Sequence, residues 1–319
     1  MRILEQFNLF MEKWIPLVTP CCLLLGVLFP DITGRGVPYV PYVFAFMSFT
    51  GGLNSTFRDI KNMFRNPAPF LTTLLILHVI MPLASFGVGC LAFSTHLNMV
   101  IGMVLEFIVP SAVTGIMWVS IYHGDSALSL SIVVLDTLIT PFTIPLTLKL
   151  LLGVNGEINV RQMIMELLLM IALPALAAMI LNQATHNETK EKLPRKLAPF
   201  SKLCLIFVVC ANSSKVAPYM RHMTVQLFAV AMVILLLAML GYALGWLAGR
   251  LLRRKDETII SMTFGSGMRN ISAGAVLAAA YFPAETMFPV MIGTLFQQVL
   301  AAFYGALLQK FQHVVAEQN

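Results

Sequence analysis

Long apolar stretches alternate with short polar segments along the whole chain. A helix needs about 20 mostly apolar residues to cross the hydrocarbon core of a bilayer, so each long stretch predicts a membrane-spanning helix. The ten predicted spans cover residues 14–30, 38–52, 68–93, 97–122, 125–152, 161–182, 198–213, 224–249, 257–281 and 284–309. Residues 54–67 carry Arg58, Lys61 and Arg65 among apolar residues, and they predict an interfacial linker.

The basic residues between the predicted spans lie mainly on one side of the membrane. With ten spans, both termini fall on the same side, which also holds the linker 54–67 and the basic segment 250–255. The opposite side holds Arg35, Lys149, Arg161, Lys215 and Arg221. Because Lys and Arg are enriched in cytoplasmic loops, we expect both termini in the cytoplasm.

The two halves of the chain, residues 1–155 and 156–319, each hold five predicted spans. Pro16 in the first span corresponds to Pro174 in the sixth, and Pro110 corresponds to Gly267. An odd number of spans makes the second half enter the membrane from the opposite side. The predicted fold is therefore an all-α polytopic membrane protein with two inverted five-helix repeats, a recurring plan of secondary transporters.

The fourth span of each half is interrupted. Pro110 lies in the middle of span 4, where it removes a backbone donor and breaks the helix near Val109. Span 9 contains Gly265, Gly267 and Asn270 in an apolar helix. Single prolines and glycines are common as kinks, but two breaks in corresponding positions indicate a transport site. Further candidates for that site lie beside the breaks, and they are Gly115, Thr114 and Ser266.

Three ionisable residues, Glu106, Asp136 and Arg269, lie well inside predicted spans. Each costs roughly 2.5–3.5 kcal/mol at a helix centre on insertion scales, so we expect them to face the protein interior and to pair. Asp136 is the expected partner of Arg269, and Glu106 is the other candidate. The pair either ties two helices together, or Arg269 binds a substrate carboxylate while an acidic residue titrates. His78 in span 3 is either a packing residue or a proton relay.

Composition agrees with a chain whose solvent is mostly lipid. Of the 319 residues, 58% are hydrophobic and 11% are charged, far less charge than a soluble surface carries. The net charge of +6 does not indicate nucleic-acid binding, because the basic residues lie between the spans. The five cysteines lack the spacing of a zinc site, and no nucleophile–base pair or phosphate loop indicates an enzyme. We expect no cofactor.

Four segments resemble the bile acid:sodium symporter family. They are FMSFTGGL at 46–53, GDSALS at 124–129, GMRN at 267–270 and AAAYFP at 278–283. The resemblance covers most of the chain and implies a panel domain of spans 1, 2, 6 and 7 beside a core domain of spans 3–5 and 8–10. It implies that the broken spans 4 and 9 cross in the core. The substrates of that family are organic anions, including bile acids, sulfated steroids and, in bacteria, small carboxylates.

Many members of that family couple uptake to two sodium ions, and this sequence departs from the family pattern there. The sodium-binding positions implied by the resemblance fall on Gly115, Ile116, Val133, Gly265 and Arg269, while Ser129 keeps its hydroxyl. Sodium needs oxygen ligands, as other hard cations do. Losing most of them weakens both sites, so sodium is doubtful as a coupling ion. We infer that Arg269, balanced by Asp136, occupies the space of a lost cation.

Three interpretations follow. The first is a secondary transporter of a small organic anion that is proton-coupled or uncoupled. The second keeps sodium coupling through backbone carbonyls and the side chains of Ser129, Thr114, Ser266 or Asn270. The third is a membrane-embedded sensor or accessory subunit. In each case we expect an integral protein of a bacterial inner membrane that is a monomer or a weak oligomer. Its expected partner is the lipid bilayer, and we expect no binding to nucleic acid.

Overall fold

The computed structural model describes residues 2–57, 67–153, 159–185 and 188–318, and this part of the chain is helical without a β-strand. The first half contains α1 (Arg2–Leu28), α2 (Pro30–Thr33), η1 (Gly34–Tyr39), α3 (Val40–Gly52), α5 (Pro67–Leu75), η2 (Ile76–Ile80), α6 (Met81–Phe93), α7 (Leu97–Ile108), α8 (Thr114–Ile121) and α9 (Ser126–Leu152). The second half contains α10 (Val160–Leu167), η3 (Leu168–Ala172), α11 (Leu173–Ala184), α12 (Glu188–Arg221), α13 (Val225–Leu251), α14 (Asp256–Gly267), α15 (Ile271–Tyr281), η4 (Ala284–Thr286) and α16 (Met287–Gln318).

Six helical segments of the described chain are long and apolar enough to cross a membrane. They are Pro67–Phe93, Ser126–Leu152, Val160–Ala184, Leu193–Arg221, Val225–Leu251 and Ala284–Phe311. The segments Leu17–Leu28 and Pro30–Gly52 meet at 96° and together make up to one more span. The shorter apolar helices Leu97–Ile108 and Ile271–Tyr281 belong to predicted spans 4 and 9. A polytopic helical membrane protein is thus confirmed, while ten spans and an inverted repeat stay predictions.

The predicted seventh span is shorter than the helix that contains it. The seventh span was expected at 198–213, but α12 is much longer, since it continues through Pro199 and Pro218 to Arg221. Charged residues at both ends shortened the apolar stretch without ending the helix. The predicted interfacial linker 54–67 falls largely on residues 58–66, which lie outside the described residues.

Two helices contain a short π-helical turn just before a proline. The turn η2 precedes Pro82 near the start of α6, and η3 precedes Pro174 near the start of α11. A proline lacks the backbone donor and its ring crowds the preceding turn, so widening that turn accommodates it. The turn η2 carries His78.

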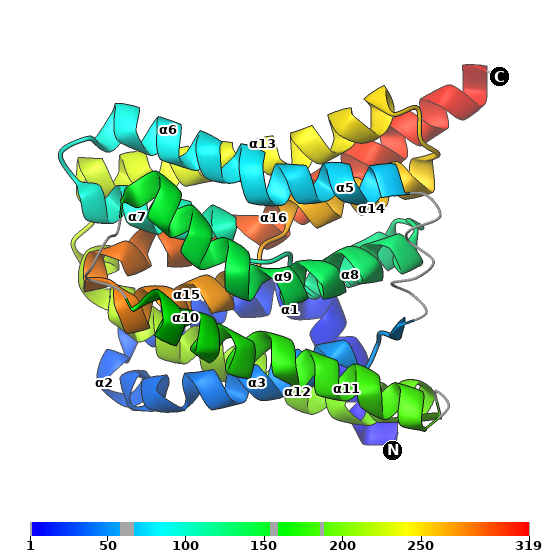
Figure 1. Ribbon diagram of the computed structural model, residues 1–319, viewed down its shortest axis with the longest axis horizontal. Helices are drawn as coiled ribbons and strands as arrows, with labels where there is room; N and C mark the ends of the chain where they lie inside the picture. The colour runs from blue at the N-terminus through cyan, green and yellow to red at the C-terminus, as the bar shows by residue number, and fades with distance from the viewer. Residues whose placement is uncertain (1, 58–66, 154–158, 186–187, 319) are drawn as a thin grey trace.

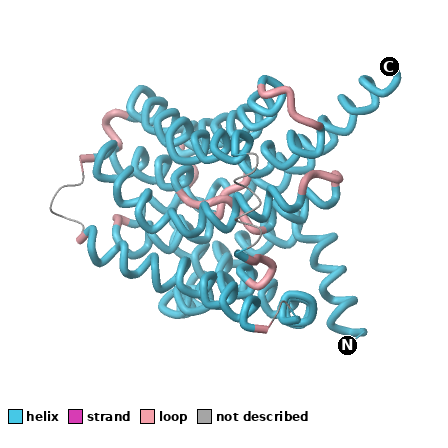
Figure 2. The backbone as a smooth tube through the Cα atoms, turned by 45° about the vertical axis from the view of Figure 1, so that its right-hand side comes forward, coloured by secondary structure: helices cyan, strands magenta, loops and turns pink. Residues whose placement is uncertain are grey.

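The helices pack in two sets around a broken centre. In one set α1 and α3 pack against α12, and α11 packs against α3; in the other, α13 packs against α14 and α16, and α6 against α7. Figure 1 shows α3, α11 and α12 along one side, α5, α6 and α13 along the other, and α7, α8 and α15 between them. Loop segments run through the middle of the helices in Figure 2, which is where the broken helices meet.

Candidate functional site

The two broken helices meet at the centre of the described structure. The helix α7 ends at Ile108 and α8 begins at Thr114, so Pro110 lies in an extended break. In the second half α14 ends at Gly267 and α15 begins at Ile271. Ser111 and Arg269 form an antiparallel β-bridge between the two breaks. The breaks are therefore joined to each other, and we call this junction of the two broken helices the crossing.

Hydrogen bonds satisfy the unwound backbone of both breaks. The amide of Asn270 donates to the carbonyl of Pro110 at 2.7 Å, and the amide of Ala112 donates to the carbonyl of Met268 at 3.1 Å. The Asn270 side chain then caps α15 by accepting from the Ala273 amide at 3.4 Å. Unpaired backbone groups at this depth cost several kcal/mol, so this pairing makes the crossing stable in lipid.

Two side chains from neighbouring helices take the remaining amides of the bridge. Asp136 Oδ2 on α9 accepts from the Ser111 amide at 2.6 Å. Gln297 Oε1 on α16 accepts from the Arg269 amide at 2.8 Å. Each broken helix is thus held by a polar side chain on the helix that follows it in the chain.

The expected ion pair between Arg269 and Asp136 is not formed. Asp136 Oδ1 lies 2.9 Å from His78 Nε2 and also accepts from the Thr140 hydroxyl at 3.4 Å, while Oδ2 is used by Ser111. Among the described residues, the three guanidinium nitrogens of Arg269 have no hydrogen-bond partner. Asp136 and Glu106 act on Arg269 only electrostatically. The pairing prediction was wrong because His78 and the broken backbone already occupy Asp136.

The other predicted site residues surround this crossing. Glu106 is buried on α7 against the backbone of Gly293, and its Oε2 has no partner in the described chain. The hydroxyl of Ser266 is likewise buried without a partner there. Ser129 is buried on α9. Gly265 packs against Ile132 on α9.

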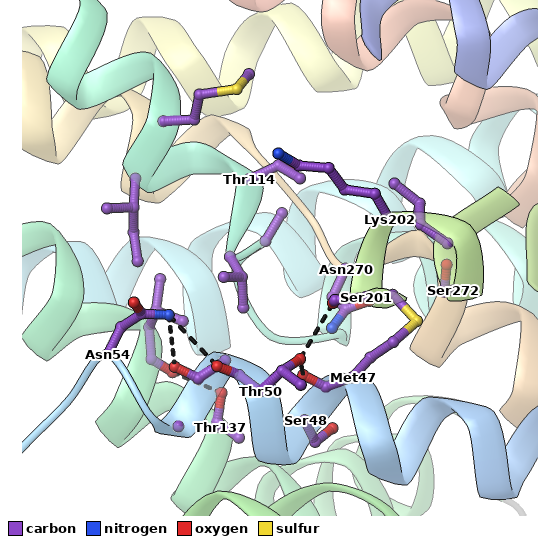
Figure 3. A pocket seen from close by; sticks show the side chains of 18 of the residues that line it. Met47, Ser48, Thr50, Asn54, Thr114, Thr137, Ser201, Lys202, Asn270 and Ser272 are labelled. Atoms are coloured by element: carbon purple, nitrogen blue, oxygen red, sulfur yellow. Dashed lines mark hydrogen bonds between the residues drawn. The ribbon is translucent and has the colours of Figure 1, made fainter. Parts of the chain in front are cut away.

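A cavity of about 570 Å³ lies beside the crossing. Its walls include residues of α3, α8, α9, α12, α16 and both breaks, among them Thr114, Asn270 and Arg269. Hydroxyl groups of Ser48, Thr50, Thr137, Ser201 and Ser272 are spread over the walls, and Lys202 extends into the cavity in Figure 3. Thr50 donates to Ser201 at 3.1 Å, which joins α3 to α12.

The charges around this cavity have one sign. Its described lining contains three cationic residues, Arg195, Lys202 and Arg269, and no Asp or Glu. The N-terminal ends of α8 and α15 also face it, through Thr114 and Ile271. Helix N-termini carry a partial positive charge that favours anions. The cavity is therefore suited to an anionic group among apolar walls.

The sodium positions implied by the family resemblance do not fit a sodium ion. Gly115 and Gly265 have no side chain, Ile116 and Val133 are apolar, and Arg269 is a cation that is only 2% exposed. No group of three or more His, Cys, Asp or Glu side chains gathers in the described residues as a metal site would. A hard cation needs several oxygen ligands, and of these positions only Ser129 supplies a side-chain oxygen.

Broken helices that cross beside a cavity define the class of helical membrane transport proteins. The profile of the sodium bile acid symporter family matches residues 41–223, and the chain belongs to this family. It is 38% identical over 298 residues to "Uncharacterized protein YbaS" of Bacillus subtilis, covering 93% of this chain and 97% of that one. It is 24% identical to "Uncharacterized sodium-dependent transporter YocS" of the same organism, covering 91% and 90%. A rice "Probable sodium/metabolite cotransporter BASS2, chloroplastic" is 20% identical, covering 88% and 65%. Membership of this family identifies a transporter and not an enzyme.

Several residues of the site were not singled out from the sequence. Ser111 and Gln297 hold the bridge, and Arg195 and Lys202 give the cavity its charge. Gln297 and its neighbour Gln298 carried a signal, because two adjacent amides in an apolar span need buried partners. Gln298 has one in the indole of Trp118, which donates to it at 2.9 Å.

Proposed function

We propose that the protein is a secondary transporter of a small organic anion that works by alternating access without the two-sodium coupling of its family. The observation that carries this proposal is the cavity beside the crossing, whose described lining holds three cations and no acidic side chain. An anion entering it meets favourable charge, whereas a neutral or cationic solute gains nothing from Lys202 or Arg195. The apolar remainder of the walls suits the carbon skeleton of such a solute.

Alternating access rests on the predicted architecture. Ten spans in two inverted repeats place a panel of spans 1, 2, 6 and 7 against a core of spans 3–5 and 8–10. The cavity has α3 and α12 on one side and α8, α9 and the breaks on the other, so a rocking of one set against the other exposes it to either face. We place the protein in a bacterial inner membrane with both termini in the cytoplasm.

The first test uses thermal unfolding of the purified protein with small mono- and dicarboxylates, each paired with its neutral amide. A ligand that binds only the folded state raises its stability, by about 2.7 kcal/mol at a hundredfold excess over the dissociation constant. We expect stabilisation by certain carboxylates and not by their amides. Lys202→Gln abolishes it, whereas Lys149→Gln, an exposed lysine outside the cavity, retains it. Equal stabilisation by the amides contradicts an anion site.

Uptake of the stabilising carboxylate into proteoliposomes then separates a transporter from a sensor or accessory subunit. We expect uptake by the wild type in sodium, potassium and choline salts alike. Arg269→Gln should impair it, because the variant removes the positive charge that acts on the buried Glu106 and Asp136. Normal uptake by Arg269→Gln counts against a role for this arginine.

Sodium coupling is the second candidate, and the relative named as a sodium-dependent transporter favours it. Backbone carbonyls at the breaks, with Ser129, Thr114, Ser266 or Asn270, then supply the oxygen ligands. Uptake that depends on sodium, with no transport in potassium or choline, supports this candidate over the first.

A further inference from the structure

Four ionisable side chains come from four different elements and lie in the interior around the crossing. Asp136 on α9 is 0% exposed, Arg269 between α14 and α15 is 2% exposed, and Glu106 on α7 is 3% exposed. The His78 side chain on η2 is 12% exposed and contacts Asp136. Tyr242 on α13 is the other titratable group that acts on Arg269. We call the four ionisable side chains the core charge group.

The formal charges of the core charge group do not balance without a proton. Two carboxylates and one guanidinium leave a net charge of −1 when the imidazole is neutral. An uncompensated charge in the interior of a membrane protein is costly. One added proton makes the group neutral. The group therefore has the composition of a site that binds a single proton.

Asp136 and His78 are two ionisable members of the group that contact each other. Asp136 Oδ2 accepts from the Ser111 amide at 2.6 Å, and its Oδ1 lies 2.9 Å from His78 Nε2. A buried carboxyl group and an imidazole at this distance are placed to share one proton. His78 is also the most exposed of the four, so it is the member through which a proton can exchange.

The same carboxylate connects this proton to the cavity. Oδ1 of Asp136 faces His78, whereas Oδ2 holds the amide of Ser111 inside the first break. The next residues, Ala112, Val113 and Thr114, line the cavity. Loss of the proton therefore changes the charge of the His78–Asp136 pair. The same Asp136 carboxyl group binds the backbone of Ser111, next to the cavity wall.

We propose that His78 and Asp136 form a proton-binding site and that this proton is the ion coupled to anion transport. The proton-binding site stands on the core charge group alone, whereas its coupling to transport rests on the proposed function. One proton carried with a monoanion makes transport electroneutral. A gradient of one pH unit then supports about tenfold accumulation of the anion, because a factor of ten in concentration equals about 1.4 kcal/mol.

The first experiment measures thermal stability against pH for the purified protein in sodium-free buffer. His78→Gln removes the proton-binding group and keeps a side chain of similar size. We expect the wild type to show a pH-dependent change in unfolding temperature that His78→Gln lacks. The matched control His96→Gln replaces an exposed histidine and should keep the change. A His78→Gln profile with the full wild-type pH dependence overturns the proton site.

A second variant covers the case in which His78→Gln does not fold. His78→Lys keeps a positive charge beside Asp136, so it should fold, with the pH dependence removed. Should both variants fail to fold, wild-type proteoliposomes decide. The probe is the carboxylate that stabilised the protein, with an imposed pH gradient as the only driving force.

The outcomes distinguish the two proposals. Accumulation driven by the pH gradient in the wild type, with only downhill uptake by a folded His78 variant, supports proton coupling. Downhill uptake without pH-driven accumulation overturns proton coupling and leaves an uncoupled anion transporter. A pH-dependent step assigned to His78 in a protein that transports no carboxylate supports the proton site and contradicts the proposed function.

Discussion

Gly267 at the end of α14 is required by packing, and replacing it gives a sharp test of the crossing. A Cβ atom built on Gly267 lies within 2.5 Å of three ring carbons of Tyr242. This ring cannot easily move, because it is fully buried, stacks on Tyr304 at 4.9 Å and donates its hydroxyl to the Gln297 carbonyl at 3.1 Å. Overpacking of this kind typically costs about 1–3 kcal/mol. We therefore expect Gly267→Ala to lower the free energy of unfolding by about that amount.

Gly265→Ala is the matched control, since it lies on the same buried helix two residues earlier. A Cβ built there meets Ile132 at 3.4 Å and Thr73 at 3.5 Å, which is ordinary contact. Alanine in a helix gains up to about 1 kcal/mol over glycine, so the control should be neutral or slightly stabilising. Denaturant unfolding in detergent measures both variants. A Gly267→Ala variant as stable as the wild type, or an equal loss of stability in both variants, contradicts the packing requirement at Gly267.

Three further predictions test other parts of the structure. Asn182→Ala should lower the free energy of unfolding by about 1–3 kcal/mol, because the buried amide donates to the carbonyls of Leu53 and Ser55 at 2.8 and 2.9 Å, and these lose their partner; an unchanged unfolding midpoint contradicts it. Thermal stability should be equal in sodium, potassium and choline chloride at equal ionic strength, whereas stabilisation specific to sodium shows that real sodium sites survive. In a cysteine-free background, a membrane-impermeant thiol reagent should label His222→Cys and not Lys255→Cys in intact cells, and the reverse pattern contradicts cytoplasmic termini.

The helices of the fold could be predicted because lipid imposes a strong rule on the sequence. Each spanning helix must be apolar over most of its length, so the long apolar segments from Pro67–Phe93 to Ala284–Phe311 are visible in the chain. The position of the first break was also readable, since Pro110 has no backbone donor to offer. The length of α12 was not readable, because its charged ends resemble loop segments while remaining helical.

The partners of the site residues could not be predicted in the same way. Arg269 had two possible carboxylate partners, and sequence offers no means to see that Asp136 is already bound to Ser111 and adjacent to His78. The role of Gln297 depends on α16 passing the second break, which is a property of the tertiary structure. Periodicity predicts which residues are buried, but only packing decides which polar groups meet.

The way in which the crossing is held bears on coupling. The amides of Ser111 and Arg269 are bound by Asp136 and Gln297, so the two breaks keep their shape through protein groups alone. A transporter that needed sodium to organise its broken helices would leave side-chain oxygens like those of Asp136 and Gln297 free for the ion. Here the positive charge of Arg269 is built into the chain, and it cannot leave during a transport cycle. On our proposal the coupling ion is a proton, which changes the charge of a group that stays in the chain, and the contact between His78 and Asp136 is the site proposed for it.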